Sequence, residues 1–185
     1  MTDDAHSRSL SDPANFWATE ARQLQWDQFP SDILFPDPSS PAGYTWFRDG
    51  VISPSYNLVT RHVLAGRGDV PAICYDSPVT GAKRVISYAE LQVEVEVLAE
   101  VLRDLGVRRG DRCLLYMPMV PEALVAMLAV GFVGAVHVVV FGGFAGAECA
   151  KRLEGCGAVV VLTASCGVEG GRKVAYLPMV CPLFF

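Results

Sequence analysis

The chain has 185 residues, of which 51% are hydrophobic and 19% are charged. This apolar content is enough to drive burial against chain entropy, so a disordered protein is excluded. The 15 lysine and arginine residues are outnumbered by 20 aspartate and glutamate residues, which gives a net charge of −5. No nucleic-acid partner is expected, because phosphate binding depends on clustered cations and no basic stripe is present. The length predicts one domain of about 100 to 200 residues with an appended segment.

The cysteines indicate a reducing environment. No two of them have the C-x-x-C spacing of a zinc or redox site, so we interpret them as buried or inert thiols and assign no metal ligand. The six are Cys74, Cys113, Cys149, Cys156, Cys166 and Cys181. The N-terminus has no apolar segment typical of a secretory signal. We expect an intracellular location, the cytoplasm by default and the mitochondrion as the alternative.

The first 50 residues are polar and rich in proline, yet they also contain many aromatic residues. Disordered tails rarely hold so many, so this segment is expected to pack as an extension on something larger. Asp12 and Pro13 predict the cap and first position of a helix that runs to about Leu24. A second short helix is predicted over residues 56–64, ended by Gly66.

A regular alternation of strands and helices begins near residue 72. Residues 72–75 and 84–87 predict a strand pair around a turn, and Ser87 with Glu90 predicts a capping box for the next helix. That helix is expected to end at Gly106 and to bury one apolar stripe. The stripe consists of Leu91, Val95, Leu98, Leu102 and Leu105. Three glutamates of the same helix are expected on its solvated face: Glu94, Glu96 and Glu100.

The rest of the chain predicts an α/β fold. Strands are expected at 113–117, 135–141 and 158–163, and helices at 121–133 and near 147–153. These strands are continuous apolar runs separated by helices, which favours a parallel sheet with helices on both faces. In such sheets ligands bind at the carboxyl ends of strands, here at residues 117–122 and 141–144.

The uncharged run from Leu124 to Phe141 has two interpretations. Its length satisfies the rule for a membrane span. The alternative is a buried helix followed by a buried strand, which is favoured because Gly131 and Gly134 interrupt the run and valine dominates after Gly134. We therefore expect no membrane span. His137 within this strand is interpreted as a core histidine rather than a catalytic one.

Two glycine-rich segments are candidate binding sites. Phe141-Gly142-Gly143-Phe144 stands between a strand and a helix, where glycines let backbone amides approach a phosphate. The alternative, which the motif alone favours because the fuller G-x-G-x-x-G pattern is missing, is a tight turn without a ligand. Residues 167–173 combine glycines with Arg172 and Lys173, which could hold an anion. The alternative for this second segment is a solvated surface loop.

Several motifs occur in a fixed order along nearly the whole chain. They are Trp46-Phe47-x-x-Gly50, Ser55-Tyr56-Asn57-x-x-x-Arg61-His62, Leu105-Gly106-Val107-x-x-Gly110-Asp111-Arg112, Tyr116-Met117-Pro118-Met119-x-Pro121-Glu122-Ala123, Ala126-Met127-Leu128-Ala129 and Val140-Phe141-Gly142-Gly143-Phe144. Together they resemble the N-terminal part of AMP-forming short-chain acyl-CoA synthetases, and the resemblance covers about residues 16 to 180. The stretch from Ala164 to Val180 is similar to the propionyl-CoA synthetase branch, with Glu169 where acetyl-CoA synthetases have arginine.

The resemblance implies a partial N-terminal domain of the adenylate-forming fold and a two-step reaction. A short-chain carboxylate and ATP, with its Mg²⁺, give an acyl-adenylate and pyrophosphate, and the thiol of CoA then displaces AMP. The residues implied to lie against the nucleotide end of CoA are Phe141, Gly142, Gly143, Glu169, Gly170, Gly171 and Arg172. Arg172 matches the family's cation for a CoA phosphate, whereas Glu169 supplies no second cation.

The resemblance also implies a division into a synthetase-type extension (1–67), the start of the ligase domain (68–180) and a tail outside the family pattern (181–185). The family's ATP loop, acyl pocket and catalytic lysine have no counterpart in these residues. We therefore assign no catalytic residue and expect a truncated product or gene-model fragment that is inactive alone. The alternatives are a non-catalytic CoA-binding or regulatory remnant and a small membrane-associated protein. Acetate and propionate stay undistinguished.

Overall fold

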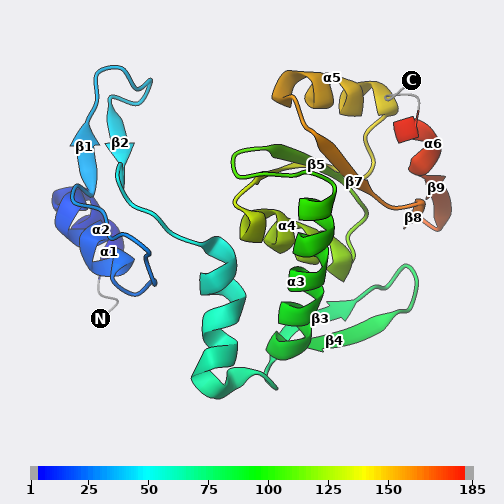
Figure 1. Cartoon of the computed structure of the whole chain (residues 1–185), viewed down its shortest axis with the longest axis horizontal. Coiled ribbons are helices and arrows are strands. Elements are labelled where there is room, and N and C mark those ends of the chain that lie inside the picture. The colour runs from blue at the N-terminus through cyan, green and yellow to red at the C-terminus, as the bar shows by residue number, and fades with distance from the viewer. Residues whose placement is uncertain (1–3, 182–185) are drawn as a thin grey trace. The chain divides into compact units, whose positions relative to one another are not determined.

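The computed structural model describes residues 4–181 and forms two compact units, Met1–Ser53 and Pro54–Phe185. The first unit contains two helices, α1 (Ala5–Ser11) and α2 (Pro13–Ala21), and a hairpin of β1 (Leu34–Pro36) and β2 (Tyr44–Trp46) (Figure 1). The Asp12 carboxylate accepts a hydrogen bond from the Asn15 amide at 3.2 Å, so the predicted cap of α2 is confirmed. The helix ends before the predicted Leu24.

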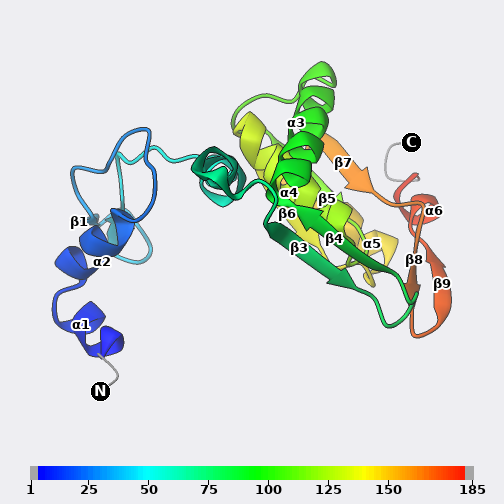
Figure 2. The same ribbon diagram turned by 90° about the horizontal axis from the view of Figure 1, so that it is seen from below.

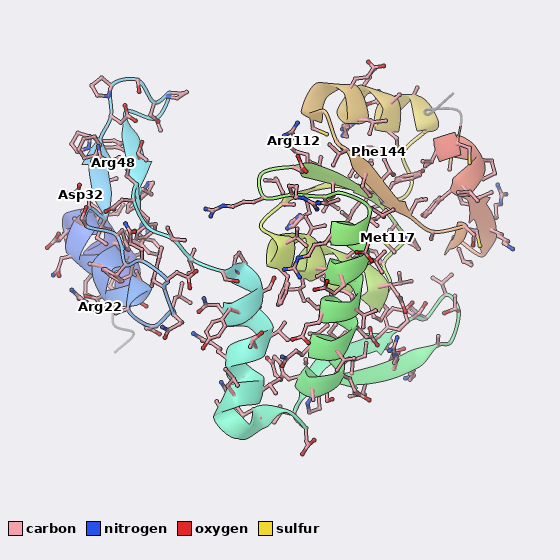
Figure 3. All side chains as sticks on the ribbon, in the orientation of Figure 1. Arg22, Asp32, Arg48, Arg112, Met117 and Phe144 are labelled. Carbon is pink, nitrogen blue, oxygen red and sulfur yellow. The ribbon has the colours of Figure 1, made fainter. Side chains whose placement is uncertain are left out.

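The aromatic residues of the first unit pack on one another. The rings of Trp17 and Trp46 lie 6.2 Å apart between centroids, and those of Trp26 and Phe47 lie 5.5 Å apart. Figure 3 marks Arg48, which lies 3.9 Å from Asp32 and stacks over an aromatic ring of β1. Trp17 and Trp46 keep 41% and 45% of their surface exposed, so these ring contacts stabilise the unit without forming a buried core.

The second unit begins with a segment where an ordinary helix was expected. Residues Tyr56–Thr60 (η1) and Val63–Arg67 (η2) are π-helical, with wider turns than an α-helix. Gly66, the predicted helix end, has a left-handed φ of 74° inside this segment. The predicted strand pair follows as β3 (Pro71–Asp76) and β4 (Lys83–Ser87), which are antiparallel.

Helix α3 (Tyr88–Asp104) confirms the predicted capping box. The Ser87 amide donates to the Glu90 carboxylate at 2.8 Å, and the Glu90 amide donates to the Ser87 hydroxyl at 3.3 Å. Most of the predicted stripe is buried, with Ala99 added to it. Leu105 was wrongly included: it is 63% exposed, because the helix ends one residue before it.

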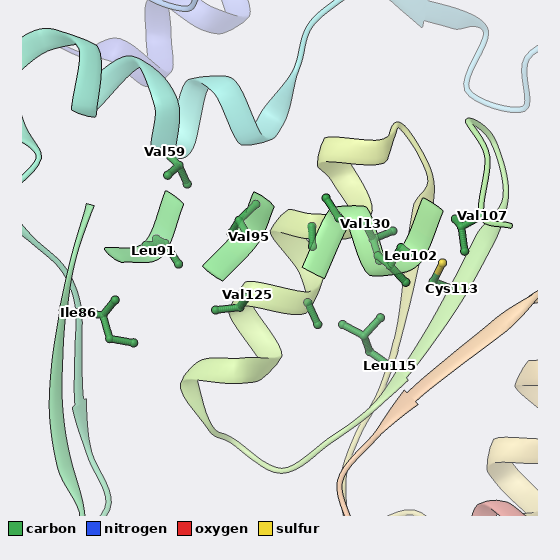
Figure 4. Close-up of a cluster of buried hydrophobic side chains, with 13 residues drawn as sticks. Val59, Ile86, Leu91, Val95, Leu102, Val107, Cys113, Leu115, Val125 and Val130 are labelled. Atoms are coloured by element: carbon green, nitrogen blue, oxygen red, sulfur yellow. The ribbon is translucent and has the colours of Figure 1, made fainter. Parts of the chain in front are cut away.

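The predicted α/β fold is confirmed. Three parallel strands lie in the order β6-β5-β7: β5 (Arg112–Tyr116), β6 (Val136–Val140) and β7 (Val160–Thr163). Helices α3 and α4 (Pro121–Val133) cover one face of this sheet, and α5 (Gly146–Cys156) covers the other (Figures 1 and 2). Figure 4 shows the larger core, in which Val95 and Leu102 of α3 meet Val130 of α4 and Leu115 of β5.

Strand β6 is less buried than expected. Val136 and Val139 are each 51% exposed, and His137 is exposed as well, so its interpretation as a core histidine was wrong. The reason is position: within residues 4–181, β6 pairs with β5 alone, so its other side is an edge.

The apolar run from Leu124 to Phe141 is a helix followed by a strand, as favoured. Helix α4 stops at Gly134, whose φ of 80° is left-handed, and β6 starts two residues later. No helix among the described residues is both long enough and apolar enough to cross a bilayer.

Candidate functional site

The first predicted binding segment is the turn after β6. Gly142 is buried, whereas Phe141, Gly143 and Phe144 are exposed. A Cβ atom on residue 142 would lie 2.9 Å from the Met117 carbonyl oxygen, so glycine is required here by packing within the chain. Figure 3 labels Met117 and Phe144 near the end of the sheet. Of the three residues predicted here to contact CoA, Phe141 and Gly143 are therefore accessible to a ligand, and Gly142 is not.

The turn carries two aromatic rings, one of which meets a cation of α5. The Phe141 and Phe144 rings are edge-on with centroids 5.9 Å apart, and Phe141 is 66% exposed. The Arg152 guanidinium of α5 lies 4.8 Å from the centre of the Phe144 ring and donates to the Glu148 carboxylate at 2.9 Å. Hydrogen bonds from Lys151 and Arg152 lower the pKa of Glu148 below its usual value.

The second predicted segment forms a β-hairpin, where no strand was expected from the sequence. Strands β8 (Cys166–Glu169) and β9 (Arg172–Ala175) are antiparallel and are joined by Gly170 and Gly171. These glycines have φ values of 53° and 77°, the left-handed conformations that two-residue hairpin turns need. An added Cβ at either position would meet no atom within 4 Å, so the backbone conformation alone demands glycine.

Arg172 and Lys173 lie on opposite faces of β9, because side chains alternate along a strand. Val174 is half-buried against the core that includes Tyr116, and Arg172 shares its face. Both cations are exposed. The geometry therefore distinguishes two neighbouring residues of equal charge: Arg172 projects on the side of the core, and Lys173 on the other.

Tyr176 brings the two predicted segments together. Its hydroxyl oxygen would lie 2.6 Å from a Cβ on Gly142 and 2.8 Å from a Cβ on Gly167, so the turn after β6 and the base of the hairpin meet at this side chain. Tyr176 is fully buried and its ring centre is 4.8 Å from that of Tyr116. Sequence reasoning missed this role. The available signal was the pair of glycines, which often marks a close approach of another group.

Further features lie outside these two segments. An apolar groove of about 600 Å³ runs between η1, α3, α4 and β6, and none of the predicted CoA residues lines it. Glu94, expected on a solvated face, forms an ion pair with Arg84. No cluster of potential metal ligands occurs within residues 4–181.

The cysteines differ in their surroundings. Cys113 and Cys149 are buried, and desolvation raises the pKa of both thiols, which makes them unreactive as expected. Cys74 and Cys181 are exposed, so the expected burial does not hold for these two thiols.

Two family models match the chain. The model for AMP-binding enzymes matches residues 60–181, and the model for the acetyl-coenzyme A synthetase N-terminus matches residues 2–58. The division predicted after residue 67 stays a prediction. Of the predicted tail 181–185, residues 182–185 lie outside the described residues.

Curated relatives agree with this assignment. An uncharacterized protein of Pseudomonas aeruginosa is 50% identical over 95% of this chain and 28% of its own length. The mitochondrial acyl-CoA synthetase short-chain family member 3 of Rattus norvegicus is 44% identical over 93% of this chain and 25% of its own. The acetyl-coenzyme A synthetase of Streptomyces avermitilis is 44% identical over 97% and 27%.

The chain spans about a quarter of the length of these relatives. The second unit has a parallel sheet with helices on both faces. The match to the AMP-binding enzyme model over residues 60–181 includes all strands of this sheet and these helices. The chain belongs to the AMP-binding enzyme family and is homologous to the N-terminal portion of acetyl-CoA and short-chain acyl-CoA synthetases.

Proposed function

We propose that this chain is the N-terminal part of an AMP-forming short-chain acyl-CoA synthetase and that it contributes the surface for the nucleotide end of CoA. The observation that carries the proposal is the contact of Tyr176 with both Gly142 and Gly167. This contact joins the turn 141–144 and the β8–β9 hairpin into one edge of the molecule. In the proposal, one CoA molecule, which carries several phosphates and a base, contacts both segments.

Each exposed group of this edge has a chemical role in the proposal. The Arg172 guanidinium makes a charge-assisted hydrogen bond to a CoA phosphate, which is stronger than a neutral contact. The exposed Phe141 ring offers a face on which the adenine base stacks. Gly143 exposes its backbone to the same ligand, and Gly170 and Gly171 keep the hairpin tip free of side chains.

The reaction follows from the family. The carboxylate attacks ATP, presented with Mg²⁺, to give acyl-adenylate and pyrophosphate, and the CoA thiol then displaces AMP. We propose propionate or acetate as the carboxylate, and we choose neither, because the family's acyl pocket has no counterpart in residues 1–185. We assign no catalytic residue to residues 1–185, so the chain alone is expected to bind CoA without forming acyl-adenylate. An intracellular location, the cytoplasm or the mitochondrion, belongs to the same proposal.

The proposal is tested in a chimera that joins this chain to the remaining part of the Streptomyces avermitilis acetyl-coenzyme A synthetase. Pyrophosphate exchange with ATP measures the first step, and varied CoA at saturating ATP and carboxylate measures the second. We expect Arg172→Ala to raise KM for CoA about tenfold to hundredfold, the effect of losing one charge-assisted contact, and to leave exchange unchanged.

Lys173→Ala is the matched control, because it removes the same charge from the opposite face of β9. It should change neither step appreciably. An unchanged CoA dependence in the Arg172 variant, or an equal loss in pyrophosphate exchange, would show that the hairpin is only a surface element.

A further inference from the structure

We propose that Tyr176 is a positioning residue that sets the spacing between the turn 141–144 and the β8–β9 hairpin, and thereby the affinity for CoA. The inference rests on the proposed function of this edge and adds a residue that touches no ligand itself. Tyr176 has no exposed surface, so any effect on a ligand must pass through its neighbours.

The tyrosine is held at the base of the hairpin. The amides of Tyr176 and Leu177 donate to the Ser165 carbonyl oxygen at 3.1 and 3.3 Å, which ties the chain after β9 to the residue before β8. Arg172 lies at the start of the same strand β9. A displacement of Tyr176 therefore moves the hairpin that carries Arg172.

The ring of Tyr176 is fixed by a second buried tyrosine. The Tyr116 ring lies 4.8 Å away at 39°, and the Tyr116 hydroxyl donates to the Phe144 carbonyl oxygen at 2.6 Å. Tyr116 belongs to the central strand β5. The ring pair thus links the hairpin to the sheet, and the sheet to the far end of the turn.

The two glycines that face the hydroxyl make the contact close. At Gly142 and Gly167 an added Cβ would come within 2.8 Å of the hydroxyl oxygen, which is shorter than real Cβ contacts. Both segments therefore approach Tyr176 with bare backbone. A smaller side chain at position 176 would leave a gap between them, and the walls of a buried gap move partway into it.

The test uses two variants and a control. Tyr176→Phe removes the hydroxyl and keeps the ring, whereas Tyr176→Leu removes the ring. Tyr75→Phe, in β3, removes the hydroxyl of a tyrosine that lies outside the buried cluster of Tyr176. Amide hydrogen exchange of the free chain reports on residues 141–144 and 166–175, and titration with CoA reports on affinity.

We expect faster exchange in both segments of Tyr176→Leu, with α3 unchanged, and CoA affinity about tenfold to hundredfold weaker, because small misplacements of binding groups are costly. Tyr176→Phe should show the same changes to a smaller degree, and it serves alone if the leucine variant does not fold. In an Arg172→Ala background Tyr176→Phe should have a smaller effect on CoA affinity, because only the contacts of the turn 141–144 are then left to be misplaced. If Tyr176 had only a structural role, Tyr176→Phe would weaken CoA binding in the Arg172→Ala background as much as in the wild type.

Unchanged exchange in both segments of both variants would overturn the positioning role. Faster exchange with unchanged CoA affinity would contradict the proposed CoA surface and therefore the inference about affinity. It would leave intact the conclusion that Tyr176 holds the two segments together. A loss of affinity in Tyr75→Phe equal to that in Tyr176→Phe would show a general loss of stability and would also overturn the inference.

Discussion

The Tyr176 hydroxyl and the Gly142 backbone approach so closely that a Cβ atom on residue 142 would lie 2.6 Å from the hydroxyl oxygen. We expect Gly142→Ala to destabilise the chain by about 2 kcal/mol, since overfilling a packed site costs about 1 to 3 kcal/mol. In a Tyr176→Phe background the cost should be smaller by at least about 0.5 kcal/mol, because contacting residues couple. Denaturant unfolding of the four proteins measures this.

Gly155→Ala is the control for this cycle. It lies in α5, where an added Cβ meets no atom within 4 Å, so it should be neutral or stabilising by about 0.5 to 1 kcal/mol. Strictly additive costs of Gly142→Ala and Tyr176→Phe would contradict the contact.

Arg112 holds the end of α5 against β5. Its guanidinium donates to the carbonyl oxygens of Cys156 at 2.8 Å and Gly157 at 3.0 Å, which are unpaired groups of the helix C-terminus. Arg112→Ala should lower the free energy of unfolding by about 2 kcal/mol, the typical value for bonds to a charged donor. Arg109→Ala, three residues earlier and exposed, should have little effect, and equal losses in both variants would contradict this role.

Glu90 gives α3 a pH-dependent cap. Hydrogen bonds from the Ser87 amide and hydroxyl lower its pKa below the ordinary 4.5, so the folded state binds this proton less readily than the unfolded state. The stabilisation is complete above the unfolded pKa and is lost as pH falls through the folded pKa. Below about pH 4.5 the Tm of the wild type should therefore fall more steeply than that of Glu90→Gln. Glu154→Gln, an exposed site on α5, is the control, and identical Tm profiles of wild type and Glu90→Gln would contradict the assignment.

The elements with clear end signals could be predicted from the sequence. Pro121 and Gly134 bound α4 as expected, and Ser87 with Glu90 placed the start of α3. The π-helical character of η1 and η2 could not be predicted, because a π-helix and an α-helix share similar residue preferences. The exposure of His137 depends on which strands flank β6, and a strand's own residues do not encode its neighbours.

The site was only partly predictable. Gly170 and Gly171 form the dipeptide typical of a two-residue hairpin turn, so the sequence contained a local signal for the hairpin although no strand was predicted there. The meeting of Gly142 with Gly167 through Tyr176 is long-range, and the spacing of the three residues in the sequence does not contain it.

The exposed edge of β6 should cause self-association. Val136 and Val139 face solvent on a strand whose outer side is unpaired within the described residues. We expect the chain to form concentration-dependent oligomers in sedimentation velocity, and Val139→Lys to reduce them, because a charge on an edge strand opposes pairing. A wild-type monomer at all concentrations would contradict this prediction.

Titration of the isotope-labelled chain with CoA, followed by backbone NMR, tests the central claim most directly. The account predicts that the amide signals of residues 141–144 and of Gly170 to Arg172 shift together with one dissociation constant. The same shifts should be strongly weakened by Arg172→Ala and retained in Lys173→Ala. Shifts confined to one of the two segments, shifts located elsewhere, or equal behaviour of the two variants would contradict a shared CoA surface.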